Sequence, residues 1–140
     1  CGDGGAGQAA KICNNMLLAV SMIGTCEAFA LAEKLGLSKE AAFEVMSTSS
    51  GSCWSVNTYC PVPGVGPNTP ADNGYMPGFS ADLMLKDASL AQQAANEVGQ
   101  ATPRGQYATM LYQHFVANGG EGKDFSGIIE YLKTAQRGSA

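Results

Sequence analysis

The feature that most constrains this chain is a long apolar stretch near its start, from residue 4 to about residue 35. Lys11 is the only charged side chain in its first 23 residues, 4–26. From Met16 onward, apolar side chains occupy nearly the whole helical circumference, a pattern typical of a helix buried within a larger body. We predict one helix from near Ala6 to a glycine stop at Gly36, about 45 Å long at 1.5 Å per residue.

Lys11 is the candidate for chemistry on this helix. A lone ammonium on a buried helix is costly to desolvate unless it meets a partner or a ligand. Burial and the nearby helix N-terminus both favour the neutral amine, which can exchange a proton near neutral pH. Asn15 lies four residues on, on the same face, and Asn14 lies one residue round, so an amide could orient a hydroxyl or carboxylate. A lysine that simply reaches solvent remains an equal alternative.

The rest of the chain predicts further helices and no strands. Ser38 is a predicted N-cap, as is Ser80, and Pro103 is predicted at the first position of a later helix. Asp124 or Ser126 is expected to cap the last helix. The predicted helices are 39–49, a short piece up to Tyr59, 80–98, 103–119 and a final amphipathic helix around Ile128, Ile129 and Leu132, with a loop over 60–78. The fold class is therefore all-α, a multi-helix domain over residues 1–140 built around the long, largely buried N-terminal helix.

Composition excludes several partners. A net charge of −4 with only eight basic residues gives no footprint for nucleic acid and argues against an anionic membrane surface. The longest apolar run, Met16 to Ile23, is far shorter than the roughly 20 residues that span a bilayer. Five cysteines without a CxxC pair indicate reduced thiols. With a single histidine, His114, no metal site is expected. Charged residues make up only 14% of the chain, so we expect its surface to meet another domain or subunit.

The glycines before the helix satisfy G-x-G-x-x-G by letter, from Gly2 to Gly7. The dinucleotide fingerprint needs a preceding strand and a βαβ unit, and one very long helix follows here instead. A flexible entry turn is the better interpretation. The chain opens on Cys1 without a methionine, so we expect a fragment or a processed form.

A second group of candidates lies farther along the chain. Lys86 follows three apolar residues and adjoins Asp87. A pattern of this kind more often marks a surface lysine beside an acid than a binding site. Trp54, the only tryptophan, stands in a Ser/Gly-rich break and could form the wall of a pocket, although simple packing is equally open.

Together, these motifs resemble the β-hydroxyacid dehydrogenase family. The helix start matches that family's G-x-G-x-x-x-K-x-x-N-N motif, and the resemblance extends in order over nearly the whole chain. Its segments are Gly5–Asn15, Ser50–Ser55, Tyr59–Val65, Gly78–Phe79 and Leu83–Asp87.

The resemblance implies the C-terminal helical catalytic and dimerisation domain of such an enzyme, similar to the C-terminal-like fold of 6-phosphogluconate dehydrogenase. In that family a separate N-terminal Rossmann domain binds NAD, and this chain lacks it. The resemblance implies that Lys11 is the catalytic general acid/base, that Asn15 and Asn14 bind substrate, and that Lys86 lies beside the cofactor. It also implies that Trp54 and Phe79 form walls of the substrate pocket.

Within the family, the chain looks most like members that oxidise 3-hydroxyisobutyrate to methylmalonate semialdehyde in valine catabolism. Reduction of tartronate semialdehyde, another β-hydroxyacid substrate, or a non-catalytic dimerisation role of the same fold stays open. We expect the isolated domain to be inactive, and the enzyme to be a homodimer or higher homo-oligomer. The expected compartment is the cytoplasm in a bacterium or the mitochondrial matrix in a eukaryote.

Overall fold

The computed structural model describes residues 4–134 of the chain. These residues form helices and turns, with one isolated bridge between Ser80 and Asp124 as their only β pairing. The elements are α1 (Gly4–Lys34), α2 (Lys39–Thr48), α3 (Trp54–Asn57), the 3₁₀ turn η1 (Pro70–Asn73), α4 (Ala81–Val98), α5 (Pro103–Phe115), the π-helical turn η2 (Val116–Gly120), the 3₁₀ turn η3 (Phe125–Gly127) and α6 (Ile128–Thr134). The predicted all-α class is confirmed.

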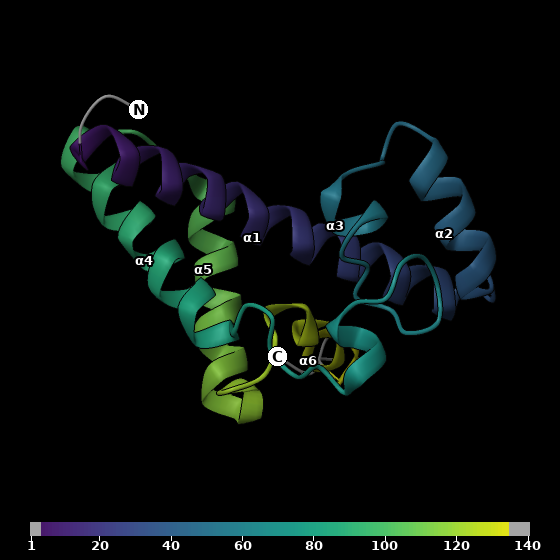
Figure 1. The fold of residues 1–140 in the computed structure, drawn as a ribbon. Helices are drawn as coiled ribbons and strands as arrows, with labels where there is room; N and C mark the ends of the chain where they lie inside the picture. Colours follow the sequence, from purple (N-terminus) through teal and green to yellow (C-terminus); the bar gives the residue numbers. More distant parts are fainter. Residues whose placement is uncertain (1–3, 135–140) are drawn as a thin grey trace.

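Helix α1 organises the molecule, since every other α-helix packs against it. Figure 1 shows α4 and α5 running beside its N-terminal half, and α2 and α3 lying at its other end. Helix α6 lies beneath the middle. Gly105 allows the close approach of α5, because a Cβ there would lie 2.5 Å from the Met16 sulfur.

The local signals in the sequence mark these helix ends correctly. The hydroxyl of Ser38 accepts a hydrogen bond from the Ala41 amide at 3.1 Å, and that of Ser80 accepts from Leu83 at 3.3 Å. Gly36 and Gly99 adopt left-handed φ values of 84° and 72°, as a helix-terminating glycine requires. The fifth predicted helix ends earlier as a regular α-helix, at Phe115, and continues as η2.

Burial along α1 is uneven, contrary to the prediction. The core takes the second half of the helix, where the buried side chains are Ala19, Met22, Ile23, Thr25, Cys26 and Phe29. Residues 5–18 contain no fully buried side chain, and Leu17 is 65% exposed. The prediction of one long N-terminal helix is confirmed, but burial around its whole circumference is wrong for this first half, because within the chain only α4 and α5 cover it on one side.

By length and composition alone, residues 5–34 of α1 could cross a membrane, which the short Met16–Ile23 run did not suggest. This is weak evidence, since the core helix of a folded domain meets the same criterion. The buried second half of α1 in this fold is such a helix.

The proline- and glycine-rich loop over 60–78 is held by hydrogen bonds rather than by regular structure. The Tyr75 hydroxyl donates to the Pro61 carbonyl at 2.7 Å, and the Thr69 hydroxyl donates to Cys60 at 3.0 Å. Asp72 accepts from the Gly64 amide at 2.7 Å. The loop is therefore ordered, and it brings the chain back to the start of α4.

Candidate functional site

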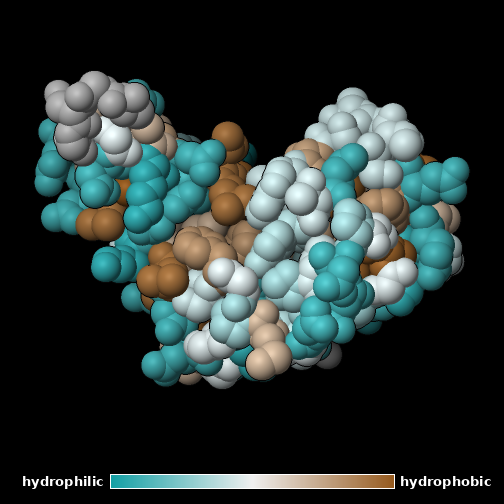
Figure 2. All heavy atoms as spheres, viewed as in Figure 1, coloured by the Kyte–Doolittle hydropathy of each residue, from teal (hydrophilic) through white to brown (hydrophobic). Residues whose placement is uncertain are grey.

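A cavity of about 630 Å³ opens between the middle of α1 and the start of α3. In the space-filling view, the upper edge of the molecule is hollowed above the middle of α1, with hydrophobic surface on one wall (Figure 2). The residues that line the cavity are Asn14, Leu17, Leu18, Ser21, Cys53, Trp54 and Ser55. It is the size of a small-molecule site.

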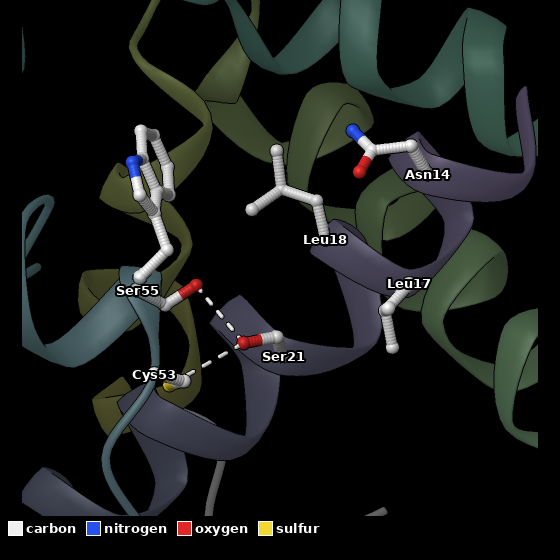
Figure 3. Close-up of a pocket in the computed structure, with 7 residues that line it drawn as sticks. Asn14, Leu17, Leu18, Ser21, Cys53 and Ser55 are labelled. Atoms are coloured by element: carbon white, nitrogen blue, oxygen red, sulfur yellow. Dashed lines mark hydrogen bonds between the residues drawn. The ribbon is translucent and has the colours of Figure 1, made fainter. Parts of the chain in front are cut away.

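One face of α1 supplies a wall of this cavity. Leu17 and Leu18 lie three and four residues after Asn14, and Ser21 lies four and three residues after them, so the four side chains share that face. Lys11 precedes Asn14 by three residues and Asn15 by four, so it lies one turn beyond the cavity wall. The wall therefore changes along the helix from a polar end to an apolar centre and then to a hydroxyl (Figure 3).

The far end of the cavity is a cluster of hydroxyls and a thiol. Ser21 donates to the Ser55 hydroxyl at 3.1 Å and to the Cys53 sulfur at 3.6 Å, both drawn in Figure 3. Thr25 lies 3.8 Å from the same sulfur. Partial burial raises the pKa of the Cys53 thiol, but hydrogen bonds from Ser21, from the Val56 and Ser55 amides and from Thr25 outweigh it, so the pKa is lowered overall.

Trp54 lines the cavity while remaining half exposed, at 50%. Its ring stacks on Tyr59, with centroids 4.9 Å apart. The Tyr59 hydroxyl donates to Asp124 at 2.7 Å. Desolvation raises the pKa of Tyr59, and this hydrogen bond to a carboxylate raises it further. The Trp54 ring is therefore positioned by stacking on the Tyr59 ring, which the hydrogen bond to Asp124 holds in place.

Phe79 is not among the residues that line the cavity. Its ring meets Phe125 edge-on at 5.5 Å, and its amide donates to Asp124 at 3.0 Å. Phe125 also packs against Tyr59 at 5.4 Å, so a row of aromatic rings connects Phe79 to Trp54. The structure thus links the two predicted wall residues without bringing both to the same opening.

The two asparagines are joined to a buried acid on α4. The Asn15 side-chain amide donates to the Asp87 carboxylate at 2.7 Å, and the Asn14 amide donates to the Asn15 carbonyl oxygen at 3.1 Å. Asp87 is only 7% exposed. Asn15, predicted to bind substrate, is thus already held by another side chain, and Asn14 is the member of the pair that lines the cavity.

The two predicted lysines lie at the surface. Lys11 and Lys86 are both exposed, and neither forms an ion pair with any residue from 4 to 134. Lys11 is therefore not desolvated by this chain, and the expected burial around it is wrong here because α1 is covered on one side only. Lys86 directly precedes Asp87 on α4, on the helix that Asn15 contacts.

Three elements of the site were not predicted from the sequence as functional: Asp87, the Ser21–Cys53–Ser55 cluster and Asp124. The burial of Asp87 has a sequence signal, since it falls on the stripe of α4 formed by Met84, Ala88 and Ala91, all buried. Among the described residues, no group of three or more His, Cys, Asp or Glu could hold a metal ion.

Comparison with known proteins gives a consistent result. Residues 5–132 match a family model described as NAD-binding of NADP-dependent 3-hydroxyisobutyrate dehydrogenase. A probable 3-hydroxyisobutyrate dehydrogenase of Mycobacterium tuberculosis is 50% identical over 133 residues, which are 95% of this chain and 45% of that protein. The human mitochondrial 3-hydroxyisobutyrate dehydrogenase is 47% identical over 133 residues, covering 95% and 40%.

The fold has solved counterparts as well. The structure of Mycobacterium tuberculosis 3-hydroxyisobutyrate dehydrogenase with L-serine matches with a TM-score of 0.90 and 51% identity. The match covers 94% of this chain and 45% of that one. A 3-hydroxyisobutyrate dehydrogenase structure from Salmonella typhimurium, 22% identical, shares the fold with a TM-score of 0.72 over 87% and 40% of the two chains. The chain spans less than half the length of these relatives.

Proposed function

The chain belongs to the 3-hydroxyisobutyrate dehydrogenase family, and on that premise we propose that it is the C-terminal helical domain of an NAD-dependent 3-hydroxyisobutyrate dehydrogenase. In this proposal an N-terminal Rossmann domain binds most of the cofactor. The enzyme oxidises 3-hydroxyisobutyrate to methylmalonate semialdehyde, the reaction that places it in valine catabolism. The domain without its Rossmann partner is inactive.

The observation that carries the proposal is the arrangement along α1. Lys11 lies one helical turn from Asn14, which lines a cavity with an apolar centre, and Asn15 lies beside it. A base, two amides and an apolar pocket within two turns suit proton transfer on a small hydroxy acid. The exposed first half of α1, with Leu17 65% exposed, offers a surface for the Rossmann domain to cover.

The reaction requires two transfers from the alcohol. Bound NAD would supply the acceptor for the hydride that leaves the carbon carrying the hydroxyl. The Lys11 side chain is the group proposed to accept the hydroxyl proton while the C–O single bond becomes a carbonyl. Asn15 and Asn14 orient the substrate, and Leu17, Leu18 and Trp54 exclude water from it.

Lys86 is the proposed cofactor contact of this chain. It is exposed on α4 beside Asp87, so its ammonium is free to reach an anionic group brought by another domain. Phe79 supports the pocket through the aromatic row described above rather than from the cavity wall. The family model names NADP, so measuring KM for both NAD and NADP decides the cofactor preference.

The direct test is Lys11→Ala in the full-length enzyme. We expect turnover to fall by at least about a thousandfold because the proton acceptor is lost, with NAD affinity little changed. Lys34→Ala, at the opposite end of α1 and also exposed, is the matched control and should behave as wild type. Near-normal turnover of Lys11→Ala would overturn the proposal.

One observation favours a second candidate, a non-catalytic dimerisation domain. Lys11 is exposed and does not line the cavity, as a lysine without a chemical role would be. Activity of the full-length protein with 3-hydroxyisobutyrate and with tartronate semialdehyde separates the candidates: a catalytic domain gives turnover that favours one substrate, and a dimerisation module gives turnover with neither. The apolar surface exposed on α1 and α4 also predicts self-association, which sedimentation at micromolar concentration measures. Relatives in bacteria and in mitochondria agree with either proposed compartment.

A further inference from the structure

We propose that Asp87 is a positioning residue for the hydroxy-acid site, and that it sets the direction of both side-chain amides beside Lys11. The inference rests on the proposed function for the reaction it serves. It concerns a carboxylate to which the family resemblance assigns no role, on α4 rather than on α1, where Lys11, Asn14 and Asn15 lie.

The burial of Asp87 is the first step of the argument. The side chain is 7% exposed on the face of α4 that packs against α1. No lysine, arginine or histidine among residues 4–134 lies within ion-pair distance of it. A buried carboxylate without a cation is costly, so its hydrogen-bond partner matters. That partner is the Asn15 amide, at 2.7 Å.

The second step follows from donor and acceptor chemistry. A carboxylate can only accept, so Asn15 must turn its NH₂ group toward Asp87 and its carbonyl oxygen away. That oxygen accepts the Asn14 amide at 3.1 Å, so Asn14 must in turn direct its NH₂ group toward Asn15. The acid thus orders a directional chain, Asn14 to Asn15 to Asp87. Without it, either amide could rotate by 180° and exchange its donor and acceptor ends.

The third step is what this order leaves for the substrate. Asn14 keeps its carbonyl oxygen and one N–H for the cavity it lines, beside Leu18 (Figure 3). The remaining N–H of Asn14, fixed one turn from Lys11, can donate to the hydroxyl oxygen of a hydroxy acid, which leaves the hydroxyl proton to the Lys11 amine. Asp87 therefore acts on the hydroxyl through two amides, without touching the substrate.

The test uses the full-length enzyme and a double-mutant cycle. Asp87→Asn keeps the shape but removes the group that can only accept, and we expect kcat/KM for the hydroxy acid to fall roughly tenfold to a hundredfold through misorientation. The KM for NAD should stay within about twofold, since the cofactor is bound mainly elsewhere. Glu97→Gln, an exposed acid on the same helix, is the control and should leave both constants unchanged.

The cycle separates positioning from a general structural role. If Asp87 acts through Asn15, then Asp87→Asn should cost little more once Asn15→Ala is present, and the two losses will not add. Asp87→Glu, which keeps an acceptor-only group, should recover part of the activity. Full activity of Asp87→Asn, or losses that add, would overturn this inference while Lys11→Ala still abolishes turnover. If Lys11→Ala is active, the proposed function itself fails.

Discussion

Two buried aspartates, Asp87 and Asp124, lie in different regions of this domain and are satisfied in different ways. Asp124, fully buried, accepts five hydrogen bonds: from the Tyr59 hydroxyl, the Gly78 and Phe79 amides, and the amide and hydroxyl of Ser126. Asp87 accepts a side-chain bond from Asn15. The first carboxylate ties its own segment to Tyr59 and to the Gly78–Phe79 backbone, 45 to 65 residues away. The second holds the orientation of one side chain.

This difference distinguishes an acid that stabilises the fold from an acid that positions other side chains. Asp124 joins Tyr59, the Gly78–Phe79 end of the long loop and the Ser126 segment, so its loss releases three main-chain donors, of which the Ser126 amide is buried. Asp87 lies within regular helix, where the backbone is already satisfied, so its loss releases one amide. We therefore expect their mutations to separate cleanly into effects on stability and effects on activity.

The largest effect is expected from Asp124→Ala. It leaves the Gly78, Phe79 and Ser126 amides and the Tyr59 hydroxyl without their acceptor, at roughly 3–5 kcal/mol in the free energy of unfolding. Urea unfolding followed by circular dichroism measures it. A loss below about 1 kcal/mol would show that Asp124 contributes little to the stability of the fold. The two acids would then not differ in their effect on stability.

Tyr59→Phe removes one of the five hydrogen bonds to Asp124, and should lower the free energy of unfolding by about 1 kcal/mol at neutral pH. Because the pKa of Tyr59 is raised in the folded state, its contribution is fully present below the unfolded pKa of about 10 and is lost as the pH rises above it. The phenylalanine variant should therefore lose less stability than wild type on going from pH 9 to pH 11. Equal losses in urea unfolding at the two pH values would contradict the bond to Asp124.

A smaller stability change is expected from Asp87→Asn. Removing a buried charge offsets most of the loss of the hydrogen bond to Asn15, so the free energy of unfolding should change by less than about 1 kcal/mol. The same urea titration measures it beside Asp124→Ala. A loss as large as that of Asp124→Ala would show that Asp87 also stabilises the fold, and would abolish the distinction between the two acids.

The sequence predicted the helices better than it predicted either acid. Ser38, Ser80, Gly36 and Gly99 mark helix ends through short-range chemistry, and each appears as predicted. Asp124 was predicted as a cap, and one of its oxygens does accept from Ser126, two residues on. The Ser126 hydroxyl donates to the same oxygen, and the other three bonds come from residues 45 to 65 positions away, which no local pattern encodes.

The candidate site shows the same limit. The Lys11–Asn15 spacing follows from helical geometry and could be predicted from the sequence, whereas the Asn15–Asp87 bond spans 72 residues and depends on how α4 crosses α1. The sequence left burial and exposure of Lys11 as equal alternatives and could not decide between them. An apolar helix signals that a surface will be covered, and does not say whether this chain or another domain covers it.

A comparably small effect on stability is expected at the far end of the cavity, where hydrogen bonds change the acidity of one side chain rather than stabilise the fold. Ser21 is half-buried and bonds to Cys53 and Ser55, so Ser21→Ala should change the free energy of unfolding by about 1 kcal/mol or less. It should raise the pKa of the Cys53 thiol, because the Ser21 hydroxyl is one of the hydrogen bonds that lower it.

The rate of iodoacetamide alkylation at Cys53, followed by peptide mass spectrometry across pH 6–10, reports this shift, since the thiolate is the nucleophile. The titration curve should move to higher pH in Ser21→Ala, while the exposed Cys13 in the same sample keeps its curve and serves as the internal control. An unchanged Cys53 curve would show that Ser21 packs against the thiol without tuning it. In that case hydrogen bonds between side chains would affect the site only at its Asn14–Asn15 end, where Asp87 acts.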